Sequence, residues 1–126
     1  METQVKHNIT ILVVDDSSFL LKAESILLEA MGYRVLTAEN AYQAIQVISE
    51  QPVNLVITDY NMPYIRGDEL VFLIHQRFPR LLVVVATSSE KTEIAPIKQV
   101  GSLKIFKKPL LEHQVEELVQ EVLGCC

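Results

Sequence analysis

The sequence has few cysteines, and this scarcity excludes two kinds of small protein. Two cysteines occur among 126 residues, as the adjacent pair Cys125 and Cys126. Adjacent cysteines rarely pair with each other, and two ligands do not complete a zinc site. A disulfide scaffold and a structural zinc domain are therefore excluded. We expect the pair to lie in a frayed, reduced tail, and a lipidation signal is the alternative.

The sequence also lacks an excess of positive charge and any long apolar run. It has 11 Lys and Arg against 16 Asp and Glu, which gives a net charge of −5. Because binding to nucleic acid requires clustered basic residues, we expect no nucleic-acid partner. The apolar runs are far shorter than the ~20 residues that span a bilayer. The N-terminus has no signal-peptide core, so we expect a cytoplasmic protein without membrane contact.

The residues that are present are enough for one hydrophobic core. Apolar residues make up 49% of the chain, which argues against a disordered chain. A chain of this length usually forms one domain. We therefore expect a single domain over residues 1–126, with its core at about residues 9–123.

Short aliphatic runs alternate with segments of helical spacing. The first run, residues 9–14, is continuously apolar, as a strand buried on both faces should be. Further strands are expected at residues 33–37, 53–58, 81–86 and 103–107. Helices are expected between and after them, at about residues 19–30, 41–48, 69–78, 90–100 and 111–122. The alternation predicts an α/β fold, a doubly wound five-stranded parallel sheet of flavodoxin-like order 2-1-3-4-5 flanked by five helices.

The helical spacing also predicts which side chains face the sheet. In the first helix one apolar face consists of Phe19, Leu20, Ala23, Ile26, Leu27 and Ala30. In the second helix, capped by Asn40, the inward residues are Ala41, Ala44, Ile45 and Ile48. Asp68 is the predicted cap of the third helix, and Pro96 weakens the fourth. The inward residues of the last helix are Leu111, Val115, Leu118, Val119 and Val122.

Polar side chains follow four of the strands at one edge of the predicted sheet. They are Asp15 and Asp16, then Asp59, then Thr87, then Lys107 and Lys108. Alone, each could be a turn residue, a helix cap or a surface lysine, and strand alternation suggests that only one lysine points into the cleft. Together they lie where ligands bind in open α/β sheets, beyond the carboxyl ends of the strands. Their joint placement therefore predicts a site.

Three neighbouring carboxylates predict a magnesium site suited to phosphoryl transfer. A hard cation such as Mg²⁺ relieves their mutual repulsion, and no His or Cys lies nearby in the sequence to favour zinc. An ionised carboxylate can accept a phosphoryl group without a general base. Lys108 can neutralise the charge that arrives, and the hydroxyl of Thr87 can donate to a phosphoryl oxygen.

The order of four motifs carries a family resemblance. They are residues 12–16 (Leu-Val-Val-Asp-Asp), residues 59–63 (Asp-Tyr-Asn-Met-Pro) with Gly67 eight residues after Asp59, Thr87-Ser88, and Lys108-Pro109. This pattern resembles the receiver domain of bacterial two-component response regulators over residues 9–123. The resemblance implies that Asp59 is the phosphoacceptor. It implies that Asp16 is a direct Mg²⁺ ligand, that Asp15 assists through water, and that the backbone carbonyl of Asn61 is a third protein ligand.

The resemblance also implies partners and a switch. The phosphodonor would be a phosphohistidine on a sensor histidine kinase or a histidine phosphotransfer protein, and the output a downstream protein target. Thr87 would be the switch hydroxyl, Lys108 the phosphoryl-binding ammonium, and the Lys108-Pro109 bond is often cis in the family. Such domains are not enzymes in the usual sense, and only self-phosphoryl transfer and slow autodephosphorylation are expected.

Two departures from the family pattern leave alternatives open. Ile105 occupies the position where the family usually has an aromatic residue, while Phe106 is expected to face the core. The spacing from Thr87 to Lys108 is also one residue shorter than usual. Ile105, together with Pro96 in the intervening helix, favours as an alternative a receiver-like interaction module that binds partners without phosphorylation. A flavodoxin-like protein or an aspartate-nucleophile hydrolase is less favoured, because Asn61 stands where that hydrolase class tends to carry its acid.

Overall fold

The computed structural model describes residues 8–88 and 104–124. Five parallel strands form one sheet in the order β2-β1-β3-β4-β5, so the predicted flavodoxin-like order is confirmed. The strands are β1 (Thr10–Val14), β2 (Arg34–Ala38), β3 (Leu55–Asp59), β4 (Leu82–Thr87) and β5 (Lys104–Lys107). Their positions agree with the predicted strands to within two residues.

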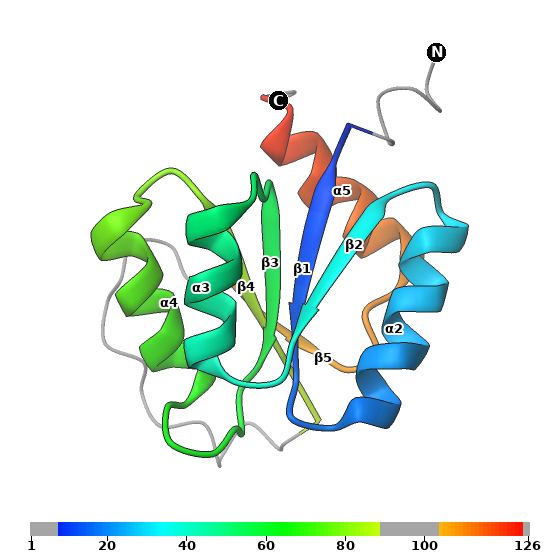
Figure 1. The fold of residues 1–126 in the computed structure, drawn as a ribbon. Coiled ribbons are helices and arrows are strands. Elements are labelled where there is room, and N and C mark those ends of the chain that lie inside the picture. Colours follow the sequence, from blue (N-terminus) through cyan, green and yellow to red (C-terminus); the bar gives the residue numbers. More distant parts are fainter. Residues whose placement is uncertain (1–7, 89–103, 125–126) are drawn as a thin grey trace.

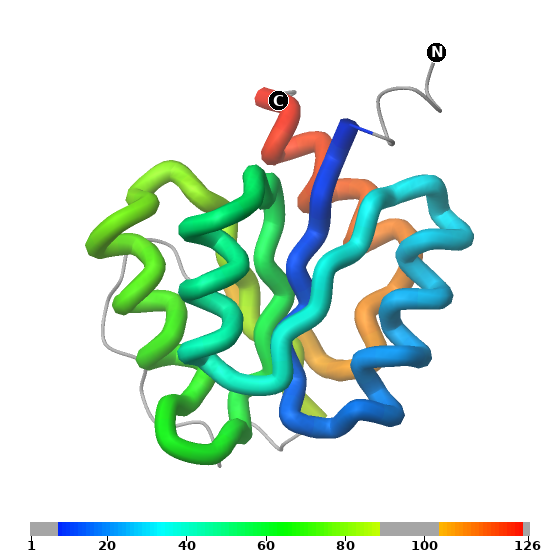
Figure 2. The backbone as a smooth tube through the Cα atoms, viewed as in Figure 1, coloured from blue at the N-terminus to red at the C-terminus, as the bar shows by residue number. Residues whose placement is uncertain are grey.

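Four helices occur in the described part of the chain and cover both faces of the sheet. They are α2 (Ser18–Ala30), α3 (Ala41–Glu50), α4 (Gly67–Arg77) and α5 (Glu112–Val122). Helices α2 and α5 lie on one face, and α3 and α4 on the other (Figures 1 and 2). The predicted helix at residues 90–100 and the cysteine pair lie outside the described residues. None of the four helices is long and apolar enough to cross a membrane.

Strand burial follows strand position, and the register brings the strand ends together. All residues of the interior strand β1 are buried, whereas the edge strand β2 exposes Arg34 and Thr37. Asp59 pairs with Ala86, and Thr87 pairs with Lys107. The carboxyl ends of β1, β3, β4 and β5 therefore share one edge, the lower edge in Figure 1.

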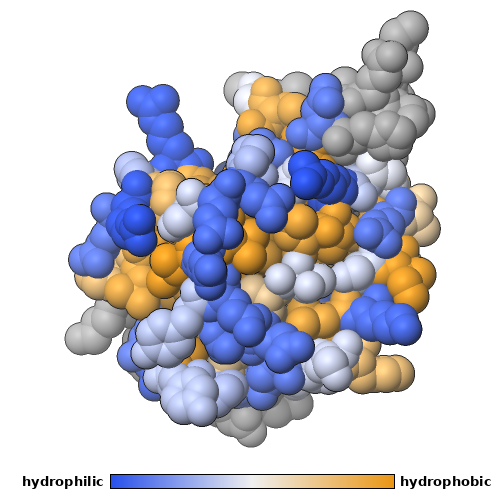
Figure 3. Space-filling view, in the orientation of Figure 1, coloured by the Kyte–Doolittle hydropathy of each residue, from blue (hydrophilic) through white to orange (hydrophobic). Residues whose placement is uncertain are grey.

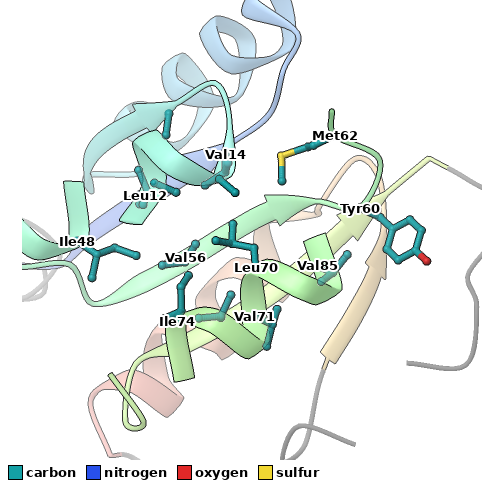
Figure 4. Close-up of a cluster of buried hydrophobic side chains, with 14 residues drawn as sticks. Leu12, Val14, Ile48, Val56, Tyr60, Met62, Leu70, Val71, Ile74 and Val85 are labelled. Atoms are coloured by element: carbon teal, nitrogen blue, oxygen red, sulfur yellow. The ribbon is translucent and has the colours of Figure 1, made fainter. Parts of the chain in front are cut away.

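The layer of α3 and α4 is packed largely as predicted. The side chain of Asn40 caps α3 by accepting from the backbone N–H of Gln43 at 2.9 Å. Figure 4 shows side chains of α4, including Leu70 and Ile74, pointing toward strand residues such as Val56. The predicted cap of α4 is wrong. The helix begins one residue before Asp68, because Arg66 is the N-cap and its backbone N–H donates to Glu69.

The predicted inward face of α2 is also wrong. The helix buries Leu21 and Leu28, whereas the large side chains expected against the sheet are exposed: Phe19 by 78%, Leu20 by 37%, Ile26 by 59% and Leu27 by 47%. The inward stripe contains Glu24 and Ser25 between its two leucines, so the more apolar face of this helix points outward. In Figure 3 hydrophobic side chains reach the surface on the side where Figure 1 places α2.

The same kind of error affects one residue of α5. Leu111, expected on the buried face, is the N-cap of the helix and is 52% exposed. The rest of that face is correct, because Val115, Leu118 and Val119 are buried and Val122 packs against them. Phe106 also packs against this cluster, as predicted.

Candidate functional site

Three carboxylates from two strand ends meet at the lower edge of the sheet. Oxygen atoms of Asp15, Asp16 and Asp59 all lie within 4.8 Å of one another. Asp15 is buried and firmly held, because its Oδ1 accepts from the backbone N–H of Ser17 at 3.0 Å and its own N–H donates to Ala38 at 3.1 Å. Asp16 is exposed and Asp59 is partly buried, so the cluster opens toward solvent.

Lys108 supplies the positive charge at this cluster. Its Nζ lies 2.5 Å from Oδ2 of Asp15 and 3.2 Å from Oδ1 of Asp59. Its side chain is only 12% exposed, whereas the neighbouring Lys107 is exposed. One of the two lysines therefore enters the site, as strand alternation predicts.

Thr87 is joined to the lysine through the backbone. The N–H of Lys108 donates to the carbonyl of Thr87 at 2.9 Å, and Thr87 itself is buried at the end of β4. The peptide bond between Lys108 and Pro109 is cis. The structure thus places the predicted hydroxyl and ammonium on adjacent strand ends.

Burial and neighbouring charges shift the pKa values of the central pair. Burial raises the pKa of Asp59, and the Asp15 charge raises it further, while Lys108 acts in the opposite direction. Burial acts to lower the pKa of Lys108, but its hydrogen bond with Asp15 and the charge of Asp59 outweigh burial and raise it. The lysine therefore stays an ammonium at neutral pH, and a nearby cation favours the charged form of Asp59.

Gly67 fixes the backbone on which Asp59 is carried. The loop after Asp59 turns back, and the N–H of Gly67 donates to the carbonyl of Tyr60 at 2.8 Å. A Cβ on Gly67 would lie 2.3 Å from the carbonyl oxygen of Asp59, which no side chain permits. Glycine therefore lets α4 begin directly against the Asp59 backbone. Asn61, exposed in the same loop, stands two residues after Asp59.

One acidic residue near the site escaped the sequence prediction. Burial raises the pKa of Glu24 in α2, and this carboxyl is influenced by the charges of Lys108, Asp15 and Asp59. A signal was present, since Glu24 stands three residues after Leu21 and four before Leu28 on one helix face. The stronger apolar pattern on the opposite face concealed it.

The donor atoms fit a hard divalent cation. The cluster consists of carboxylate oxygens alone, and its most exposed member, Asp16, leaves room for water. Mg²⁺ prefers oxygen ligands and usually keeps several waters. Asp15, Asp16 and Asp59 are therefore the residues that could hold such an ion in this structure.

Comparison with known proteins gives one consistent family. A family model described as the response regulator receiver domain matches residues 11–122. The chemotaxis protein CheY homolog of Campylobacter jejuni is 31% identical over 121 residues, covering 90% of this chain and 92% of the relative. A CheY-like receiver domain protein from Methanospirillum hungatei is 25% identical, with a TM-score of 0.82 over 92% of this chain and 97% of that one.

A further solved structure has the same fold at lower identity. It is the response regulator protein TrrA of Thermotoga maritima, solved in complex with Mg²⁺ and BeF. It is 24% identical, with a TM-score of 0.78 over 90% of this chain and 98% of that one.

Proposed function

The chain belongs to the response regulator receiver domain family, and from this premise we propose that it accepts a phosphoryl group on Asp59. Receiver domains are signalling domains of two-component systems, so the modified residue acts as a switch and not as a catalyst that turns over. The observation that carries the proposal is the meeting of Asp15, Asp16 and Asp59 with Lys108 at one strand edge. Residues 9–123 would form one receiver unit.

We assign the acidic residues to Mg²⁺. Asp16 would bind the ion directly, Asp15 would assist through water, and one oxygen of Asp59 and the backbone carbonyl of Asn61 would complete the protein ligands. The bound ion would offset the negative charge of the incoming phosphoryl oxygens. The TrrA complex with Mg²⁺ and BeF supports this assignment by analogy of fold.

The chain's own residues would carry the transfer. One carboxylate oxygen of Asp59 attacks phosphorus, the N–P bond of a phosphohistidine breaks, and the imidazole nitrogen keeps the electron pair. Lys108, already held 2.5 Å from Asp15 and 3.2 Å from Asp59, can pair with a phosphoryl oxygen. Thr87, at the adjacent strand end, can donate its hydroxyl to another. These contacts would stabilise the new acyl phosphate.

The phosphodonor would be a protein, either a sensor histidine kinase or a histidine phosphotransfer protein. The exposed apolar face of α2 supports this assignment. It consists of Phe19, Leu20, Ala23, Ile26, Leu27 and Ala30. This face begins in the first helical turn after Asp16, so a protein whose phosphohistidine reaches Asp59 would cover it. Apolar surface of this kind is typical of protein-binding sites.

The decisive experiment measures phosphoryl-mimic binding with a matched variant. Wild type and Asp59→Asn are titrated with beryllofluoride in the presence of Mg²⁺, and backbone NMR shifts are recorded. Saturable shifts around residues 59, 87 and 108 are expected in wild type and should be absent in Asp59→Asn. Equal responses in the two proteins, or none in wild type, would contradict the assignment.

A measurement of partner binding with and without beryllofluoride decides on a second candidate function. Ile105, 41% exposed on β5, stands where the family usually has an aromatic residue, which favours an interaction module that works without phosphorylation. If wild type binds its partners equally well with and without beryllofluoride, this second function is the correct one.

The α2 face has its own test. Ile26→Ser should slow transfer from a phosphohistidine protein about three- to tenfold, since interface side chains of this size contribute about 1 kcal/mol. Tyr42→Ser, on the exposed side of α3, is the matched control. Both variants should react with acetyl phosphate like wild type. Equal slowing by the two substitutions would rule out α2 as the docking face.

A further inference from the structure

A small cavity lies directly behind the proposed site, between α2, α5 and the sheet. Its volume is about 50 Å³, enough for a few water molecules. The strand side is formed by Val13 and Ile57, each two residues before a site carboxylate, and Pro109 follows the site lysine. These walls are apolar. Glu24 of α2 also lines this hollow, so its side chain lies close to the strand ends that carry the site.

The setting of Glu24 is unfavourable for a charged side chain. Burial raises its pKa, and the charges of Asp15 and Asp59 raise it further, with Lys108 opposing them. An aliphatic residue between Leu21 and Leu28 would extend the buried stripe of α2. The second acidic residue of the cavity, Glu112, has a structural explanation, because it stands in the first turn of α5, where the helix dipole favours negative charge. Glu24 stands in the middle of α2, where the helix dipole gives no such help. The positive charge of Lys108 is what favours its ionised form.

We propose that Glu24 is a positioning residue of the site, a fourth negative charge that strengthens metal binding and opposes arrival of the phosphoryl group. This inference rests on the proposed function. Glu24 acts through space on Lys108 and Asp59 without touching the metal or the phosphoryl group. One negative charge attracts a cation and repels an anion, so its removal must shift the two binding steps in opposite directions.

Two isosteric variants test the proposal. Glu24→Gln removes the charge, and Glu29→Gln removes an exposed charge from the same helix as the control. Mg²⁺ affinity is measured by isothermal titration calorimetry, and phosphorylation by acetyl phosphate is measured at saturating Mg²⁺. Glu24→Gln should weaken Mg²⁺ binding about two- to fivefold and accelerate phosphorylation by a similar factor. Glu29→Gln should leave both within about 1.5-fold of wild type, because exposed charges are screened.

Measuring both Mg²⁺ affinity and phosphorylation separates this inference from damage to the fold and from failure of the proposed function. A purely structural role of Glu24 would lower both quantities together, and that result would overturn the inference. So would unchanged values in Glu24→Gln, or equal changes in the two variants. If wild type bound Mg²⁺ but accepted no phosphoryl group, the proposed function would fail, while a calorimetric difference between Glu24→Gln and Glu29→Gln would still report on Glu24.

Discussion

The two helical layers of this protein are built differently on the same sheet. On one face, α3 and α4 bury continuous apolar stripes against the strands, including Ala44 and Leu70, both fully buried. On the other face, α2 interrupts its buried stripe with Glu24, borders a cavity of about 50 Å³, and leaves large apolar side chains such as Ile26 exposed. The helices of both layers follow strands of the same parallel sheet, so the topology does not explain this contrast. We infer that the first layer stabilises the fold, whereas α2 in the second layer also serves the site and its partner.

The largest effect on stability should come from the packed layer. Leu70→Ala removes a fully buried side chain of α4, which should cost about 3 kcal/mol because the core can close the cavity only partly. Chemical denaturation checks this value. Ile26→Ala in α2 is the matched control and should change the free energy of unfolding by less than about 0.5 kcal/mol. Similar losses in the two variants would remove the contrast between the layers.

We expect an intermediate loss of stability at the point where the packed layer meets the site. Gly67→Ala places a Cβ 2.3 Å from the carbonyl oxygen of Asp59, so α4 or the Asp59 backbone must shift. We expect a loss of about 1–3 kcal/mol in stability and, unlike Leu70→Ala, a weakened Mg²⁺ affinity in calorimetry. Unchanged metal binding would mean that Asp59 does not depend on this close approach.

The smallest predicted change in stability should be an increase. Because the pKa of Asp59 is raised in the folded protein, the folded state holds its proton more tightly than the unfolded state, and ionised Asp59 destabilises the metal-free fold. Without Mg²⁺, Asp59→Asn should therefore raise the Tm at pH 7 by a small but measurable amount.

The pH dependence of this difference checks its cause. Ionised Asp59 destabilises the fold at pH values above the pKa of Asp59 in the folded protein. This destabilisation declines as the pH falls through that pKa, and it vanishes below the unfolded value of 3.8. The Tm values of wild type and Asp59→Asn, measured by calorimetry without Mg²⁺, should thus converge as the solution is acidified. A difference that persists at low pH would assign the stabilisation to packing.

The strand order and the meeting of the site residues could be predicted because both follow from strong local signals. Continuous aliphatic runs such as β1 mark buried parallel strands, and their carboxyl ends must share an edge. The orientation of α2 could not be predicted this way. Periodicity reports which residues share a face but not whether the sheet or a partner covers it, so Phe19 and Ile26 were misassigned.

The start of α4 and the role of Glu24 depend on tertiary contacts. Asp68 had the residue type of a cap, but the close approach of Gly67 to the Asp59 backbone sets where the helix begins. Glu24 does not stand out in the sequence, because the burial that raises its pKa exists only in the folded protein. Such features arise from contacts that form only when the chain is folded.

The most direct test of the account locates the phosphoryl group chemically. The protein is phosphorylated by a phosphohistidine protein in Mg²⁺, the acyl phosphate is reduced with borohydride, and the product is mapped by peptide mass spectrometry. The account predicts modification at Asp59 alone, lost when Mg²⁺ is chelated beforehand. Modification at Asp15 or Asp16, or no modification at all, would contradict it.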